Sequence, residues 1–247
     1  MQDLVLCEVA GGLCTLTLNR PAKLNALNLE TFQELDRHLD WIQSNIEATG
    51  CVLLRGTGRS FCAGHDLDDI SDGREGQTAQ RFETGVVERL AELPVPVVAA
   101  VQGHCLTGGL ELALAADLIV ASESALFSDT HGKWDLVPVW GLSQRLPRRV
   151  GRAKALEMMF TSRNFSGREA AAMGLANICV PDAELAETIK GLTADILANA
   201  RRANCAVKKL VADTDGMTLR SGIAYELHHN AGRGPELAAR LARARKR

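Results

Sequence analysis

The sequence lacks the features that would place this protein on nucleic acids or in a membrane. Its 247 residues carry a formal net charge of −2, so the chain as a whole is not built to hold polyanions. The longest apolar runs are Pro94–Val101, which is short, and Leu112–Ala121, which Asp117 interrupts, so neither can span a bilayer. The N-terminal segment contains acidic residues and has no basic region or long apolar run, unlike a secretory signal peptide. We expect no nucleic-acid partner and no membrane association.

Cysteine pairs are also missing. The seven cysteines are scattered, and no two of them form a CxxC motif. An odd, dispersed set is typical of reduced thiols, so we expect a cytoplasmic protein without disulfides. The six histidines share no ligand spacing with the cysteines, and we therefore predict no metal site.

What the sequence does contain is an alternation of short apolar runs and amphipathic stretches. A β-hairpin is predicted first, and a helix capped by Asn28 follows it, with apolar residues at steps of three and four from Leu29 to Ile46. Further helices are predicted over 80–93, from Gly109, over 152–160 and over 166–173, the last with a capping box formed by Ser166 and Glu169. Predicted strands cover Leu4–Val9, Cys14–Leu18, Cys51–Gly56, the run from Pro94, Asp117–Ser122 and Ile178–Val180.

Strands separated by helices predict βαβ units around a parallel sheet, and hence an α/β fold. Two or three helices close the chain, and no shift in composition precedes residue 190. We therefore divide the chain into a core over residues 1–190 and a C-terminal helical region over 191–247 that together form one continuous domain. The segment Ser71–Thr78 has no periodicity and is predicted to be a loop.

The segment "HCLTGGLELAL" (His104–Leu114) places a carboxylate and two glycines in the most apolar part of the chain. Gly108 lies where a strand passes into a helix, and the first N–H groups of a helix have no intrahelical acceptor. Glu111 is one helical turn further on, so it projects toward the same region. One interpretation is a site that stabilises an anionic oxygen beside a proton-transfer group. The other is a tight turn with Glu111 near a helix terminus.

A second loop, "GRSFCAGHDLDDI" (Gly58–Ile70), favours the first interpretation. Asp66 is a good N-cap for a short helix, and the backbone N–H of His65 lies just before it. One such donor from each of two loops would form a two-point oxyanion hole.

These residues resemble the crotonase, or enoyl-CoA hydratase/isomerase, superfamily. The resemblance covers nearly the whole chain in order, through "NRPAKLNALN" (Asn19–Asn28), "FCAGHDL" (Phe61–Leu67), "PVPVVAAVQGHCLTGGLELALAADLIVAS" (Pro94–Ser122), "WGLSQRLPRRVGRAKALEMMFT" (Trp140–Thr161) and "FSGREAAAMGLANICVP" (Phe165–Pro181). It implies a spiral of ββα units with a C-terminal helical region, assembled as a homotrimer or hexamer. It also implies an acyl-CoA thioester substrate, no separate cofactor, and an enolate held by the N–H groups of His65 and Gly108.

The resemblance places two catalytic glutamates in the hydratases, and this sequence keeps only the first, as Glu111. His131 occupies the second position, within "SDTHGKWDLVPVWG" (Ser128–Gly141). Histidine can transfer protons near neutral pH, and the flanking Asp129 and Asp135 are candidates to orient its ring. The isomerases of the superfamily depend chiefly on a carboxylate at this second position, which makes simple isomerisation less favoured here.

The resemblance further implies contacts with the substrate or its CoA. The "AGHD" spelling resembles methylmalonyl-CoA decarboxylase, in which this histidine approaches the acyl group. Trp134 and Trp140 are candidates to line an acyl pocket, and Arg243 and Arg245 stand near the position where relatives present basic residues to CoA phosphates. The predicted contact residues are Ala26, Ala63, His65, Asp66, Leu67, Gly109, Trp134 and Arg243.

The sequence therefore predicts an enoyl-CoA hydratase (3-hydroxyacyl-CoA hydro-lyase) with Glu111 and His131 as its catalytic pair. Within the same superfamily, the alternatives are an acyl-CoA decarboxylase or isomerase. From another class, the alternative is an acyl-CoA binding protein with weak catalysis.

Overall fold

The centre of the computed structural model, which describes residues 3–71 and 76–245, is a six-stranded sheet. Its strand order is β1-β2-β3-β4-β6-β9; β1 and β2 form an antiparallel hairpin, and all other neighbours are parallel. The strands are β1 (Val5–Ala10), β2 (Leu13–Leu18), β3 (Cys51–Gly56), β4 (Val97–Val101), β6 (Leu118–Ser122) and β9 (Ile178–Val180). The predicted α/β class and its hairpin are confirmed.

The inner strands are buried on both faces, which explains why they read as continuous apolar runs rather than as alternating ones. All five residues of β4 are buried, as are the first four of β3. One face contributes to the main core, and the other packs against Ile189 and its neighbours on α8 (Leu185–Ala198).

A second, three-stranded sheet positions two of the loops that carry predicted site residues. Its strands are β5 (His104–Leu106), β7 (Leu126–Ser128) and β8 (Phe165–Ser166). None of the three was predicted, because segments of two or three residues are too short to show periodicity. Strand β5 leads directly into the glycine-led helix, and β7 leads into the loop that carries His131.

Most of the helices before α8 were predicted, with shifted ends, whereas α5 (Leu142–Val150) was not. The Asn28 side chain accepts a hydrogen bond from Thr31 N (3.0 Å), so it caps the first helix as predicted. The Ser166–Glu169 capping box is also present. The remaining helices before α8 are α1 (Leu29–Ser44), α2 (Leu67–Ser71), α3 (Gln77–Ala91), α4 (Gly108–Leu114), α5 (Leu142–Val150), α6 (Arg152–Thr161) and α7 (Gly167–Ala172).

Two segments differ from the prediction. Helix α3 begins at Gln77, inside the segment expected to be a loop, and residues 72–75 of that segment lie outside the described residues. Helix α1 ends at Ser44, because Asn45 donates its backbone N–H back to Ile42 and a short 3-10 turn follows.

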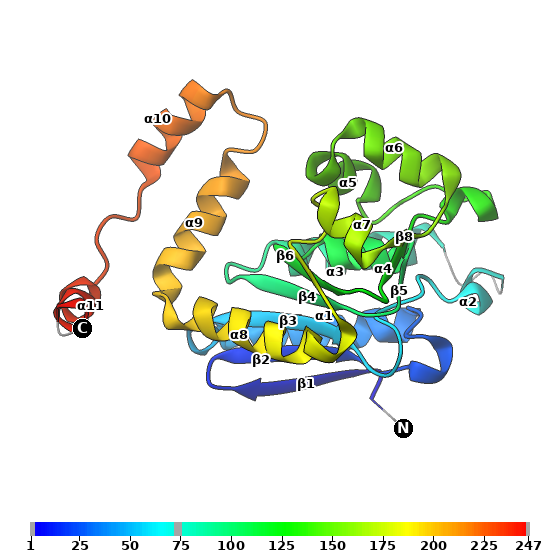
Figure 1. Cartoon of the computed structure of the whole chain (residues 1–247), viewed down its shortest axis with the longest axis horizontal. Coiled ribbons are helices and arrows are strands. Elements are labelled where there is room, and N and C mark those ends of the chain that lie inside the picture. The colour runs from blue at the N-terminus through cyan, green and yellow to red at the C-terminus, as the bar shows by residue number, and fades with distance from the viewer. Residues whose placement is uncertain (1–2, 72–75, 246–247) are drawn as a thin grey trace.

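The chain ends in four described helices rather than two or three. After α8 come α9 (Arg201–Asp213), α10 (Leu219–His229) and α11 (Leu237–Ala244), which extend away from the sheets as a C-terminal arm (Figure 1). Residues 190 and 191, where we placed the start of the helical region, lie inside α8, which packs on the sheet.

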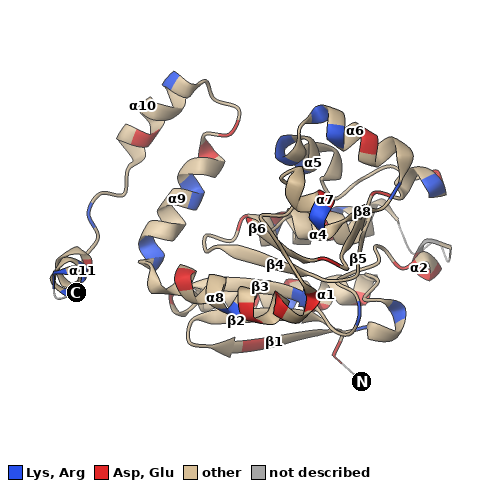
Figure 2. Ribbon diagram, in the orientation of Figure 1, with Lys and Arg blue, Asp and Glu red and all other residues tan. Residues whose placement is uncertain are grey.

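Charges of both signs alternate along several of these helices (Figure 2). Among the described residues, no helix is long and apolar enough to cross a membrane.

Candidate active site

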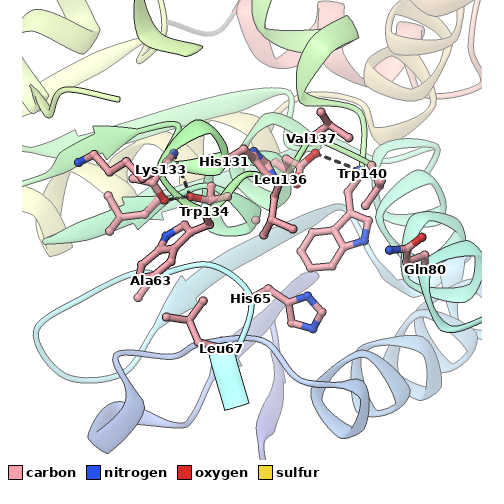
Figure 3. Close-up of a pocket in the computed structure, with 16 residues that line it drawn as sticks. Ala63, His65, Leu67, Gln80, His131, Lys133, Trp134, Leu136, Val137 and Trp140 are labelled. Carbon is pink, nitrogen blue, oxygen red and sulfur yellow. Dashed lines mark hydrogen bonds and ion pairs between the residues drawn. The ribbon is translucent and has the colours of Figure 1, made fainter. Parts of the chain in front are cut away.

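Most of the predicted site residues line one cavity of about 310 Å³. It lies between the loop before α2 and the two loops that follow β5 and β7 (Figure 3). The predicted residues that line it are Ala63, His65, Leu67, Gly108, Glu111, His131 and Trp134. The cavity therefore brings together residues that are up to 77 positions apart in the sequence, Ala63 and Trp140.

Glu111 is 1% exposed, and its carboxylate is held from one side. Oε1 accepts hydrogen bonds from the backbone N–H groups of Trp140 (2.9 Å) and Leu142 (3.2 Å). Burial raises the pKa of Glu111, although His131 and the two backbone donors act in the opposite direction. The protonated form of the carboxyl is therefore favoured more than it would be in water.

His131 faces Glu111 with one ring nitrogen and binds an aspartate with the other. Its Nδ1 lies 2.6 Å from Oδ1 of Asp129, which also accepts the backbone N–H of His131 (3.0 Å). Because a carboxylate is an acceptor, this contact places a proton on Nδ1, so that in the neutral imidazole Nε2 holds the lone pair. Nε2 lies 3.9 Å from Oε2 of Glu111, beyond hydrogen-bonding distance, so both atoms keep capacity for a third molecule.

Only one of the two flanking aspartates contacts the imidazole. Asp129 is buried beside His131, whereas Asp135 is exposed at the end of the same loop, in a left-handed conformation with φ of 55°.

The two loops with the predicted oxyanion donors touch each other. A Cβ built on Gly64 would lie 3.5 Å from the backbone nitrogen of Gly108, so the turn before His65 packs directly on the start of α4. Gly108 is the first residue of that helix, and its N–H has no intrahelical acceptor.

Close packing explains why both positions at the start of α4 are glycine. A Cβ on Gly108 would lie 2.4 Å from the indole ring of Trp140, and one on Gly109 would lie 2.4 Å from the carbonyl oxygen of Cys62. Neither contact is possible without movement of the backbone or a buried ring. Gly109 therefore lies behind the wall of the cavity and does not line the cavity itself.

The side chain of His65 takes part in the wall as well. Its ring packs against Trp140 with centroids 5.1 Å apart, and Nε2 lies 4.0 Å from Oε1 of the buried Glu83 on α3. Figure 3 shows the ring below Trp140, on the side of the cavity opposite His131.

Besides Gly109, three predicted contact residues lie outside the cavity lining: Ala26, Asp66 and Arg243. Asp66 caps α2 through the N–H of Asp68 (3.2 Å) and binds the Arg20 guanidinium at 2.8 Å. Although burial opposes its charge, the Arg20 contact and the backbone donor lower the pKa of Asp66. Arg20 also donates to the carbonyl of Ala26, so these residues brace the His65 loop.

Arg243 is the third. It lies on α11, at the end of the molecule opposite α2, and does not reach the cavity within its own chain (Figure 1).

Sequence reasoning missed the apolar wall and one polar pair. Leu136, Val137 and Val139 face the cavity from the loop after His131, where they show no periodicity. Thr107 and Thr130 join the loops of Gly108 and His131 through their hydroxyl groups, and only their positions next to these two residues would have singled them out. Among the described residues, no cluster of three histidine, cysteine or acidic side chains could hold a metal ion.

Comparisons with known proteins identify the family. Residues 8–231 match the family model described as enoyl-CoA hydratase/isomerase. The chain is 34% identical to a probable peroxisomal enoyl-CoA hydratase 1 of Arabidopsis thaliana, covering 88% of this chain and 81% of that protein. It is 33% identical to the 1,2-epoxyphenylacetyl-CoA isomerase of Escherichia coli, with 96% and 93% covered.

A solved structure shows the same fold with a ligand. The putative enoyl-CoA hydratase from Thermobifida fusca, in complex with acetoacetyl-CoA, superposes with a TM-score of 0.84 at 27% identity, covering 97% of this chain and 95% of that one. The chain therefore belongs to the enoyl-CoA hydratase/isomerase family. It is an enzyme of the enoyl-CoA hydratase type.

Proposed function

We propose that this enzyme hydrates 2-enoyl-CoA thioesters to 3-hydroxyacyl-CoA, with Glu111 and His131 as its catalytic pair. The observation that carries the proposal is the buried carboxyl and the aspartate-bound imidazole facing one another across a cavity beside Gly108. CoA is part of the substrate, so the reaction needs no separate cofactor.

The backbone N–H groups of His65 and Gly108 are proposed to hold the thioester oxygen. Hydrogen bonds to that oxygen withdraw electrons from the conjugated double bond, which makes C3 electrophilic and stabilises the enolate that follows. Removing one such donor in comparable sites costs about 3 kcal/mol of transition-state stabilisation.

The proposed roles of the pair follow from their surroundings. Asp129 leaves the lone pair of His131 on Nε2, so His131 takes a proton from water as the water oxygen bonds to C3. Burial favours protonated Glu111, which gives its proton to C2 of the enolate. The proton that His131 gained then returns to Glu111, and the balance is one water added across one double bond.

Crotonyl-CoA provides the test of this proposal. Loss of the absorbance of its conjugated thioester is followed with the wild type, Glu111→Gln and His131→Ala. Turnover by the wild type that falls at least 10²-fold in both variants supports the proposal. Absence of turnover at any enzyme concentration, with CoA esters still bound, contradicts it and favours a decarboxylase or an acyl-CoA binding role.

A second candidate reaction is isomerisation of an acyl-CoA. It is favoured by the relative in Escherichia coli, which carries the name of an isomerase. A proton donor and acceptor 3.9 Å apart can also move a proton between two carbons of one substrate. Product analysis in heavy-oxygen water separates the two reactions, because only hydration incorporates solvent oxygen.

The same proposal includes a homotrimer, or a hexamer of two trimers. The support is the C-terminal arm, whose apolar side chains lie open to solvent on a single chain, as they do at surfaces that contact other copies. The exposed apolar residues of this arm are Val207, Val211, Met217, Leu219, Ile223, Leu227, Leu237 and Leu241.

An assembly of this kind also bears on Arg243. Because α11 lies far from the cavity of its own chain, a contact between Arg243 and CoA phosphates requires the arm of a second copy. We further propose a cytoplasmic location, which is supported by the seven cysteines, all of them present as free thiols.

A further inference from the structure

Thr107 has a backbone conformation that side chains rarely adopt. Its φ of 50° and ψ of −109° lie outside the regions that residues with a Cβ favour, and a β-branched side chain makes the conformation still less favourable. Outliers of this kind persist only where the surrounding structure holds them, and they gather at functional sites. Thr107 is the residue directly before Gly108.

The contacts of Thr107 hold it in that conformation from three directions. Its backbone N–H donates to Ser128 O (2.8 Å), and its carbonyl accepts from Glu111 N (3.0 Å). Its hydroxyl accepts the backbone N–H of Thr130 (3.1 Å) and is hydrogen-bonded to the hydroxyl of Thr130.

The direction of the Thr107 hydroxyl is informative. Thr107 occupies the N-cap position of α4, where a threonine side chain usually accepts a hydrogen bond from the first turn of the helix. Here it makes no such bond and turns instead to Thr130, which directly precedes His131. The hydroxyl thus connects the loop of one proposed donor with the loop of the proposed base.

We propose that the Thr107–Thr130 hydroxyl pair is a positioning device that sets the direction of the Gly108 N–H. The ψ angle of Thr107 orients the peptide plane to which this N–H belongs, so relaxation of Thr107 toward an ordinary conformation turns the donor away from the thioester oxygen. The same pair fixes the distance between this donor and His131. This inference rests on the proposed function, since it assigns the oxygen to Gly108.

Ligand binding tests the device without requiring turnover. The probes are acetoacetyl-CoA, which carries a thioester carbonyl, and CoA, which does not. The variants are Thr107→Val, Thr130→Val and Thr107→Ser. Thr193→Val serves as the control, because Thr193 is a threonine on α8 outside the cavity whose hydroxyl bonds only to carbonyls of its own helix.

We expect Thr107→Val to weaken acetoacetyl-CoA binding about tenfold, because a misdirected donor forfeits part of the stabilisation of the oxygen. Thr130→Val should weaken it by a smaller factor in the same direction. Thr107→Ser keeps the hydroxyl group and should bind acetoacetyl-CoA as tightly as the wild type. The double valine variant should bind it no more weakly than Thr107→Val, because the two hydroxyl groups act together. CoA affinity should stay within twofold throughout.

Turnover, where it occurs, adds a second measurement. Thr107→Val should lower kcat with little change in KM if the donor acts mainly in the transition state. Unchanged acetoacetyl-CoA affinity in both valine variants would overturn the inference, as would equal losses for CoA and acetoacetyl-CoA. If the wild type binds both probes but does not hydrate crotonyl-CoA, the proposed reaction fails while the positioning role is still decided by the binding data.

Discussion

Nε2 of His131 lies 3.9 Å from Oε2 of Glu111, and each group is fixed on its far side by a different part of the chain. Asp129 holds the imidazole, and the backbone N–H groups of Trp140 and Leu142 hold the carboxyl. Two groups able to transfer protons thus face each other across part of the cavity.

Replacing Glu111 with Gln should lower kcat by about 10²- to 10⁴-fold while leaving the fold intact. The amide oxygen of Gln can still accept the hydrogen bonds from Trp140 N and Leu142 N, so no buried donor is left unpaired. Turnover of crotonyl-CoA measures the loss of kcat, and thermal unfolding of the same samples shows whether the fold is intact. Wild-type turnover in Glu111→Gln would remove this carboxyl from the mechanism.

Stability should depend on pH through the same carboxyl. Since burial raises the pKa of Glu111 above its usual value of 4.5, the native state holds the proton over a range in which the unfolded chain has released it. Stability contributed by the protonated form is therefore complete below that usual value and is lost as the pH rises through the raised one.

Urea unfolding across this range, for the wild type and Glu111→Gln, measures the effect. The free energy of unfolding of the wild type should fall relative to that of the variant as the pH rises. A constant difference between the two proteins would show that Glu111 does not titrate differently in the folded state.

Replacing Asp129 with Asn should reduce kcat by roughly 10²-fold or more. An amide that donates to Nδ1 shifts the imidazole proton to Nε2, which removes the lone pair that faces Glu111. Asp135→Asn is the matched control, because Asp135 lies on the same loop but is exposed, and Asn tolerates its left-handed conformation. Steady-state kinetics with crotonyl-CoA should separate the two variants; equal losses would point to a general effect on the loop.

Adding a methyl group at Gly108 should destabilise the protein by about 1–3 kcal/mol and lower activity, because it meets the Trp140 ring at 2.4 Å. Gly85→Ala is the control, since this glycine lies within α3 and a Cβ there meets nothing within 4 Å. It should stabilise the protein by up to about 1 kcal/mol. Thermal unfolding of the two variants decides; a stable and fully active Gly108→Ala would contradict the packing argument.

Placing a charge on the C-terminal arm should dissociate the proposed assembly. Ile223 and Leu227 lie one turn apart on α10 and are 60% and 77% exposed on a single chain. If another copy covers them, Leu227→Asp should lower the mass measured by sedimentation equilibrium. The mass should shift from that of a trimer or hexamer toward the 26.6 kDa of a single chain. Arg37→Asp, at an exposed site on α1, should leave the mass unchanged. A wild type that is itself monomeric would refute the proposed assembly.

The sequence by itself determined the sheet and the loops that carry chemistry. Short continuous apolar runs at β3 and β4 favour strands buried on both faces, and the spacing from Leu29 to Ile42 favours a helix that buries one stripe. The pairing of Glu111 with the two donor loops also followed from local rules, because helix starts expose N–H groups wherever they occur.

Only the tertiary structure decided what supports these residues. Strands β5, β7 and β8 are too short to show a period, yet they bring Gly108 and His131 to one cavity. The choice of Asp129 over Asp135 depends on how the loop after β7 turns around His131. The strained Thr107 is held by Thr130, which lies 23 residues further along the chain. The position of Arg243 far from the cavity depends on how the arm leaves the core. The spacing of apolar residues shows which face of a helix is buried, but not which part of the protein packs against that face.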